Sequence, residues 1–474
     1  MEKILGIDFR SLMLFRQIIA LLYIYTGVIL RFQFFDFYSI EKGPFTNQVM
    51  SVIQNRPVLT YVLHTDIELK IFLCFAFLVG VLLFLGILPS ITSFVAMFTY
   101  SLLSRRFFPY FYGVDEIIVS VLFVLGFVFL IRPKKEEENK EISILKNPFV
   151  LLLLFQTTII YWFNGVNKTH ISWWRGEAVS MATFNAFFNK PFALNFVNQD
   201  TLNAFLTYFT LAFELIFPIL IFSKFKSNKL RMIAGFGIII FHWGIHFFAD
   251  VTLYKYTGIA FAVLLMPTVF WEKFKFLNKL VIKPLFVLPY ALPISLKAIK
   301  IFAFSLSFFL LFKAVNASLF KQNMRYHFIE NKTILKTMES IISYSYSPFR
   351  QYWFMFAPSP PFETGYIGFD YIGNEKKENI NIYGNKMPMK NFEYYHPFHL
   401  SIIVQFNSIV KGHVPDENQF VLFSFFEYYI KNDIVIHPER KAEDYELAIY
   451  KQTYQDFRKK GKYDFERVVI ASYK

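Results

Sequence analysis

The chain consists of long apolar runs separated by short polar segments, and this pattern predicts membrane-spanning helices. A bilayer core needs about twenty apolar residues per helix. Nine runs approach that length, and they predict an all-α polytopic membrane bundle of about nine spans in residues 1–315. The expected spans are 12–31, 69–87, 89–104, 114–132, 148–166, 202–223, 231–249, 254–271 and 297–315.

One further apolar piece, 281–295, contains Pro284, Pro289 and Pro293. Proline removes a helical hydrogen bond and clashes with the preceding turn. Irregular backbone is tolerated at membrane depth only where protein or a water-filled cavity surrounds it. We therefore interpret this piece as interfacial or re-entrant.

Residues 316–474 have a different pattern, with many polar, charged, tyrosine and asparagine residues. Short alternating runs predict strands in NINIY, LSIIVQF and DFERVVIASY. The spacing of apolar residues in EDYELAIYKQTYQDFRKK predicts a helix. A small α+β domain is therefore expected at 316–474.

Composition supports a membrane protein, because 55% of the residues are hydrophobic and only 18% are charged. About a quarter of the residues are charged in a typical soluble domain. The net charge of +14 raises the possibility of nucleic-acid binding. We reject it because many Lys and Arg residues lie in short loops between apolar runs, where they face anionic lipid. The single cysteine, Cys74, excludes an intramolecular disulfide and a cysteine-based metal cluster.

Charge also predicts orientation, because basic residues concentrate in cytoplasmic loops. With the N-terminus in the cytoplasm, nine spans place three basic loops inside. Their basic residues are Arg132, Lys134, Lys135, Lys140 and Lys146; Lys224, Lys226, Lys229 and Arg231; and Lys273, Lys275, Lys279, Lys283, Lys297 and Lys300. This topology places Lys168 at the outer face and makes the C-terminal domain extracytoplasmic.

Ionisable groups in or beside spans are costly to bury, so each is a candidate site residue. The candidates are Arg16, Asp115, Glu116, Lys168, Glu214, His242, His246 and Asp250.

Lys168 lies where an apolar run ends, and it has two interpretations. It is either an interfacial anchor with its ammonium among lipid headgroups, or an amine that faces the bundle. Loss of water favours the neutral form of an amine, which is a competent base. Asn164, one turn earlier, lies on the same helix face. Trp173 and Trp174 follow, and they point to different sides of any helix.

His242 and His246 are four residues apart and share a helix face. That spacing can bind a metal, but HWGIH lacks the glutamate of the HExxH motif and no third ligand is evident. We expect no metal, and favour interhelical hydrogen bonds or contacts with a polar ligand head. Asp250 either orients His246 or is interfacial.

Glu214 lies in the middle of a span and requires a partner or a proton. Arg16 is the expected partner, in a structural ion pair. Asp115 and Glu116 begin a span, where acidic residues suit the positive end of the helix dipole.

The order of several pieces resembles the HTTM family, the integral-membrane domain shared with vitamin K-dependent γ-glutamyl carboxylase. The resemblance covers about residues 5–275. Its pieces are GIDFRSLMLFRQIIALLYI, SRRFFPYFYGVDEIIVSVLFV, IYWFNGVNKTHISWWRGEAVSM, FELIFPILIF and FHWGIHFFADVTLYKYTGIAF, with QYWFMFAPSPP resembling the entry to the outer domain of bacterial members.

The resemblance implies a quinol-dependent enzyme. In the carboxylase, a lysine at the matching position deprotonates reduced vitamin K, which leads through oxygen to a base that removes a γ-proton from glutamate before CO₂ adds. Lys168 matches that lysine by its distance from Gly165, and His242 is the second catalytic candidate. Reduced vitamin K or another membrane quinol is then the expected cofactor. The candidates for binding it are Asn164, Asp115, His246 and Glu214.

Two departures weaken carboxylation as the reaction. Asn167 replaces the first lysine of the pair found in the vertebrate enzyme, and the tail is far smaller than that enzyme's lumenal region. One relative takes part in maturation of a secreted peptide toxin, so modification of a secreted peptide or protein stays open. The alternative is a non-enzymatic membrane partner in maturation, export or immunity of a secreted peptide, with the tail as binding module. A transporter is a weaker reading, because paired broken helices are not evident.

Overall fold

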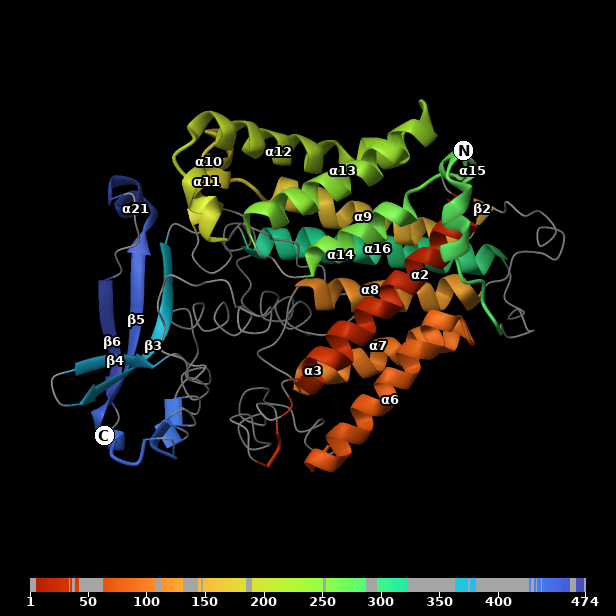
Figure 1. Ribbon diagram of the computed structural model, residues 1–474. Helices are drawn as coiled ribbons and strands as arrows, with labels where there is room; N and C mark the ends of the chain where they lie inside the picture. Colours follow the sequence, from red (N-terminus) through yellow and green to blue (C-terminus); the bar gives the residue numbers. More distant parts are fainter. Residues whose placement is uncertain are drawn as a thin grey trace, which may run out of the picture.

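The structure, a computed structural model, describes part of the chain and places it as a helical bundle with a small sheet beside it (Figure 1). The described residues are 6–33, 35, 39–41, 63–106, 113–130, 144–145, 148–184, 190–249, 253–286, 296–321, 363–373, 376–380, 426–427, 430–431, 433–435, 437–460 and 466–472.

Six of the described helices are long and apolar enough to cross a membrane, which agrees with the predicted membrane bundle. The first consists of α2 (Phe9–Ile24), a π-helical turn (Tyr25–Ile29) and α3 (Leu30–Gln33). The others are α6 (Asp66–Leu85), α9 (Pro148–Val166), α12 (Asp200–Phe222), α13 (Ser227–Phe248) and α16 (Leu296–Lys321, with its apolar part at Ala298–Val315). All six lie where spans were predicted.

Two more helices, α7 (Pro89–Arg106) and α8 (Gly113–Leu130), also lie at predicted spans. They are not among those six helices. Ser90 on α7 donates to the carbonyl of Gly126 on α8 at 2.7 Å, so the pair is joined by a buried polar contact. The count of about nine spans stays a prediction.

The predicted span at 254–271 is not one continuous helix, because the helix that begins there ends halfway; the crossing of a membrane by this segment stays a prediction. Helix α14 covers only Tyr254–Leu264, about 16 Å at 1.5 Å per residue. Pro267 explains the break, since it cannot donate a helical hydrogen bond. The hydroxyl of Ser11 donates to the carbonyl of Met266 at 2.7 Å, which satisfies one backbone group freed at the break.

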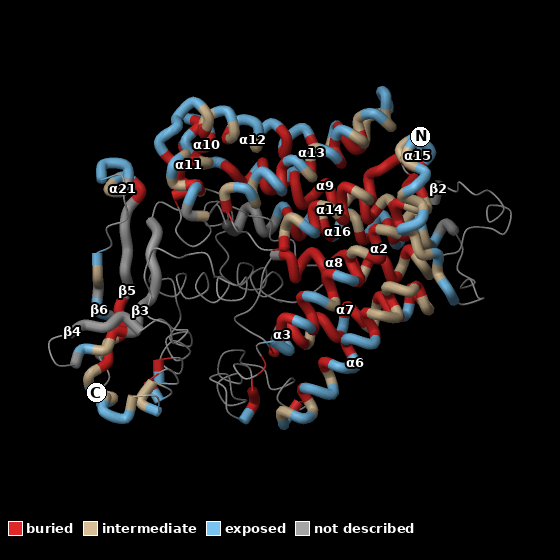
Figure 2. Tube along the Cα trace, viewed as in Figure 1, coloured by how far each residue is buried: buried red, intermediate tan, exposed pale blue. Residues whose placement is uncertain are grey.

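Burial distinguishes central from peripheral helices (Figure 2). Helices α2, α8 and α9 carry buried residues along most of their length. In contrast, α6, α12 and α13 expose large apolar side chains on their outer faces. A membrane protein presents such faces to lipid, so this distribution fits a bundle with hydrocarbon around it.

The N-terminal end of the bundle is closed by contacts between distant segments. Strand β1 (Ile7–Asp8) pairs antiparallel with β2 (Ile144–Leu145), just before α9. Arg231, near the start of α13, donates to the carbonyl of Gly6 at 2.6 Å. Nearby short elements are α15 (Thr268–Lys273) and a 3₁₀ turn (Lys275–Leu280).

The expected interfacial or re-entrant piece begins as irregular backbone held by α2. The side chain of Gln17 donates to the carbonyl of Leu280 and accepts from the amide of Ile282, both at 2.9 Å. Phe286 forms a bridge with Ile87, in the turn between α6 and α7. These contacts satisfy backbone groups without a helix over 281–286; residues 287–295 lie outside the described residues.

The described part of the tail contains a four-stranded antiparallel sheet in the order β4-β3-β5-β6. Its strands are β3 (Glu363–Gly373), β4 (Lys376–Ile380), β5 (Tyr445–Thr453) and β6 (Glu466–Ser472). The strand predicted in DFERVVIASY is confirmed as β6. The one predicted in NINIY overlaps β4 at its first two residues, and LSIIVQF lies outside the described residues.

The helix predicted over 443–460 is wrong for its first half. Tyr445–Thr453 is β5, and only Tyr454–Lys460 is helical, as α21. Strand β5 is central and pairs with β3 on one side and β6 on the other. Two ladders and the burial of Tyr445 and Leu447 outweigh the local helical spacing.

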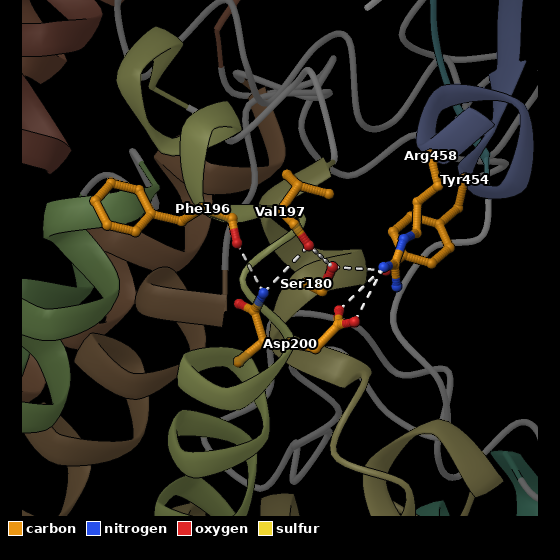
Figure 3. A network of polar contacts seen from close by, with 7 residues as sticks. Ser180, Phe196, Val197, Asp200, Tyr454 and Arg458 are labelled. Carbon is orange, nitrogen blue, oxygen red and sulfur yellow. Dashed lines mark hydrogen bonds and ion pairs between the residues drawn. The ribbon is translucent and has the colours of Figure 1, made fainter. Parts of the chain in front are cut away.

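Helix α21 joins the tail to the bundle (Figure 3). The hydroxyls of Tyr454 and Ser180 are 2.6 Å apart, and the Ser180 hydroxyl also lies 2.6 Å from the carbonyl of Val197. Arg458 donates to Asp200, the first residue of α12, at 3.0 Å. The bundle side is formed by α10 (Ile171–Trp174), α11 (Ala178–Phe184), a 3₁₀ turn (Pro191–Phe196) and the start of α12.

Tyr454→Ala is expected to loosen this junction, because the ring is buried against Met181 and Phe184. Loss of a buried aromatic side chain costs about 3 kcal/mol. Hydrogen exchange at the amides of α21 should accelerate at least about tenfold. Arg458→Ala is the control with a small effect, because an exposed ion pair contributes about 0–1 kcal/mol. Equal exchange in both variants would show that the ring does not hold α21.

Candidate functional site

Lys168 faces the interior of the bundle. It lies two residues after α9 ends, and its Nζ is 2.6 Å from Oε2 of Glu214 on α12. The residue is only 3% exposed. The interpretation of Lys168 as an anchor among lipid headgroups is therefore wrong, because its ammonium position is enclosed by protein and paired with a carboxylate.

Two more groups surround the amine. Nζ is 3.4 Å from the carbonyl of Asn164 and 4.8 Å from the centre of the Trp173 ring. The Asn164 side chain itself donates to the carbonyl of Ile160 at 2.8 Å, within α9. Trp173 is buried, whereas Trp174 is 58% exposed, so the two tryptophans point to different sides as predicted.

Gly165 allows α9 and α12 to approach closely enough for this ion pair. A Cβ at position 165 would lie 3.0 Å from the Cβ of Glu214 and 3.4 Å from its backbone carbon. Such a contact is tighter than side chains normally make. Because Gly165 has no side chain, the backbone of α12 approaches α9 closely enough for Glu214 to contact Lys168.

A second polar pair lies beside the first. The hydroxyl of Tyr161 on α9 is 2.8 Å from Nε2 of His242 on α13, and both residues are buried. The Tyr161 ring also packs against Phe217, three residues after Glu214 on α12, so the second pair adjoins the first. The structure thus brings Lys168, Glu214 and His242 into one region of the bundle together with Tyr161.

Aromatic rings form a wall along this region. The Tyr161 ring lies 4.4 Å from that of Phe217 and 6.1 Å from that of Phe213, measured between centroids. Phe241 lies 5.5 Å from the His242 ring. An apolar wall with a few convergent polar groups is the usual composition of a small-molecule site.

His242 has one unsatisfied nitrogen within the described part of the chain. Its Nδ1 is buried and has no hydrogen-bond partner there, although Nε2 is bonded to Tyr161. Leaving a buried polar atom unsatisfied costs about 1–3 kcal/mol. Such atoms are uncommon in native structures and each requires an explanation.

The predicted Arg16–Glu214 ion pair is wrong. Nη2 of Arg16 donates to the carbonyls of Phe84 at 3.2 Å and Ile282 at 2.9 Å. Arg16 therefore holds the turn after α6 and the segment after the 3₁₀ turn. Glu214 pairs with Lys168 because Gly165 brings α12 against α9, a contact that no local sequence pattern specifies.

Asp115 lies in the first turn of α8, as predicted, but in a buried cluster formed with α3 and α7. It accepts a hydrogen bond from the hydroxyl of Tyr100 and lies 3.9 Å from Nη2 of Arg31. Glu116 follows it and is also buried. Burial and ion pairing therefore add to the helix-dipole explanation for Asp115.

His246 has different partners from His242, although both are on α13. Nζ of Lys255, on α14, is 2.7 Å from its Nε2, and Lys190 donates to its backbone carbonyl at 2.5 Å. In the described residues, no group of three or more His, Cys, Asp or Glu side chains could hold a metal ion. Asp250 lies outside the described residues.

Sequence reasoning missed Tyr161 as a site residue and overlooked the packing role of Gly165. A signal for both was present, because positions 161, 165 and 168 follow the spacing of one helix face. Starting from Lys168 and counting back by turns would have found them.

Comparisons of the chain with protein-family models, curated proteins and solved structures gave no match.

Replacing Glu214 alone with leucine is expected to destabilise the protein by about 3–5 kcal/mol, because the Lys168 ammonium would be left buried without its partner. The double variant Lys168→Met, Glu214→Leu should recover most of that loss, since well-packed apolar residues can replace a buried ion pair. Denaturant unfolding in detergent micelles measures both. A double variant as unstable as Glu214→Leu would contradict the pairing.

Proposed function

We propose that this chain is an integral-membrane enzyme that acts on a lipid-soluble quinol, with Lys168 as the proton acceptor. The proposal retains the resemblance to the HTTM family. The observation that carries it is the buried Lys168–Glu214 pair, at 2.6 Å, beside an aromatic wall. A structural ion pair alone would not need the neighbouring Tyr161–His242 pair with its unsatisfied nitrogen.

The charges of the pair explain how it would take up a proton. With one shared proton, Lys168 and Glu214 are together neutral, either as ammonium and carboxylate or as amine and carboxylic acid. A second proton leaves the pair with one positive charge. This positive charge attracts the negative charge left on the quinol oxygen that lost the proton. The attraction is strong where water is excluded.

The residues present fit a ring-shaped, weakly acidic ligand. Tyr161, Phe213 and Phe217 provide apolar rings, and Lys168 and His242 provide polar groups that contact Glu214 and Tyr161. A reduced quinone would supply the acidic hydroxyl and, with oxygen, the strong base that the carboxylase-like reaction requires. A secreted peptide or protein is the substrate class that the resemblance favours.

Orientation belongs to the same proposal, with the N-terminus cytoplasmic and the tail outside. The N-terminal end of the bundle contains Arg231 and the β1–β2 pair, which brings the first basic loop beside the chain's start. The sheet lies at the other end, next to α10 and α11 (Figure 1). We propose that residues 316–474 form an extracytoplasmic α+β domain on the transmembrane domain of residues 1–315.

Reporter fusions test this orientation. Alkaline phosphatase fused after residue 474 should be active, because this enzyme folds only outside the cytoplasm. A fluorescent protein that folds only in the cytoplasm should give no signal when it is fused at the same position. A fusion within the loop 132–146 should give the reverse pattern. A bright fluorescent protein after residue 474 would overturn the proposed topology.

A non-enzymatic partner of a secreted peptide is the second candidate. The observation that favours it is the junction in Figure 3, where Tyr454 and Arg458 hold the tail against α11 and α12. Such a junction would place a binding module at the membrane surface. Under this candidate, changes in 316–474 should matter and Lys168 should not.

Lys168→Ala is expected to abolish quinol epoxidation in purified membranes while the protein remains inserted. Loss of a general base typically lowers a rate by about 10²–10⁴. The double variant Lys168→Met, Glu214→Leu serves as a second inactive form that keeps its fold. Gly244→Ala is the active control, because a Cβ there meets no atom within 4 Å. Epoxidation that persists without Lys168 would overturn the proposed function.

A further inference from the structure

The imidazole of His242 is held in one orientation by three helices. Nε2 is bonded to Tyr161 on α9, and a Cβ at Gly258 on α14 would lie 2.6 Å from its Cδ2 and 2.7 Å from its Cγ. The ring edge that carries Cδ2 is thus covered by the backbone of α14. Nδ1 lies on the opposite edge, buried and without a partner within the described residues.

The hydrogen bond to Tyr161 determines which nitrogen carries the proton. A tyrosine hydroxyl has one proton to donate, and its hydrogen bond in this structure is to Nε2 of His242. Donation to Nε2 leaves only the Nδ1 proton without a partner, whereas the reverse arrangement would leave both the hydroxyl proton and the Nδ1 lone pair without one. Nε2 is then the acceptor, and the neutral imidazole carries its own proton on Nδ1.

We propose that the Nδ1–H group of His242 donates a hydrogen bond to a ring oxygen of a quinone or quinol bound beside Lys168, and that Tyr161 is the positioning residue that fixes this donor. The inference rests on the proposed function, because it takes the ring ligand from there. It assigns the buried, unsatisfied donor a partner of defined chemistry, a ring oxygen that can accept a hydrogen bond.

The Lys168–Glu214 pair and the Tyr161–His242 pair then have different roles. Lys168 and Glu214 receive the proton from the ring hydroxyl, and the electron pair of the broken O–H bond stays on the oxygen. Nδ1–H donates to a ring oxygen and favours the form with greater negative charge, as hydrogen-bond donors do when aimed at developing charge. Tyr161 touches no reacting atom and acts through His242.

Two substitutions at one position distinguish donor from scaffold. The amide nitrogen of asparagine can occupy the place of Nδ1, whereas that of glutamine reaches the place of Nε2. His242→Asn should keep the affinity for menadione within about threefold. His242→Gln should lower it about tenfold, the factor equal to 1.4 kcal/mol. Tyr161→Phe should also weaken binding, because Nδ1 then shares its proton with Nε2.

Menadione binding to the full-length protein in nanodiscs, followed by quenching of tryptophan fluorescence, gives these affinities. Gly244→Ala should bind as the wild type does, since position 244 is open. If His242 only forms a structural hydrogen bond with Tyr161, the order of menadione affinities should be reversed. His242→Gln should then keep the wild-type affinity, and His242→Asn should bind more weakly. That order, or equal affinities, would overturn the inference. Thermal unfolding of each variant establishes that it is folded.

Failure of this inference is separable from failure of the proposed function. If Lys168→Ala abolishes epoxidation but asparagine is not better than glutamine, the donor role is wrong and the base stands. If His242→Asn binds menadione more tightly than His242→Gln but Lys168→Ala stays active, the binding site for the ring is supported and the role of Lys168 as base is wrong. A wild-type protein that does not bind menadione overturns both.

Discussion

The buried contact between Lys168 and Glu214 is the constraint on which the rest of the site depends. Removing two charged groups from water is expensive unless they meet in close geometry. The chain meets this requirement with Gly165, which brings α12 against α9, and with Trp173, whose ring covers the amine. Tyr161 belongs to the same packing, because it lies one turn before Gly165 on α9 and its hydroxyl contacts His242.

The bundle supports this site through its least exposed helices. Helix α9 is buried along most of its length, with α12 and α16 packed against it. The outer helices carry apolar faces suited to lipid. The tail contacts the region after α9 through α11 and the start of α12, the helix that carries Glu214. The site thus lies inside the bundle, and the tail contacts the helices that follow α9.

Much of the helical framework followed from apolar runs, because a bilayer imposes a length on any span. The break at Pro267 was visible in the sequence, but an apolar run on both sides suggested a continuous helix. Strand β5 was predicted as a helix because its own nine residues do not reveal that it pairs with β3 and β6. Local pattern cannot specify such partners.

Lys168, Glu214 and His242 could each be chosen from sequence as costly groups in apolar surroundings. Their pairing could not, since it depends on which helices touch. Arg16 was the plausible partner for Glu214 by charge alone. Its guanidinium instead donates hydrogen bonds to the backbone carbonyls of Phe84 and Ile282. The resemblance to the HTTM family drew attention to Lys168 but left its carboxylate unnamed.

Gly165 also restricts how the chain can change over time. A methyl group there would occupy space that the Cβ of Glu214 already fills. Alanine at 165 would require α12 to shift away from α9, and such a shift lengthens the contact between the carboxylate and the amine. The effects of substitutions at 165 and 214 are therefore expected to be coupled rather than additive.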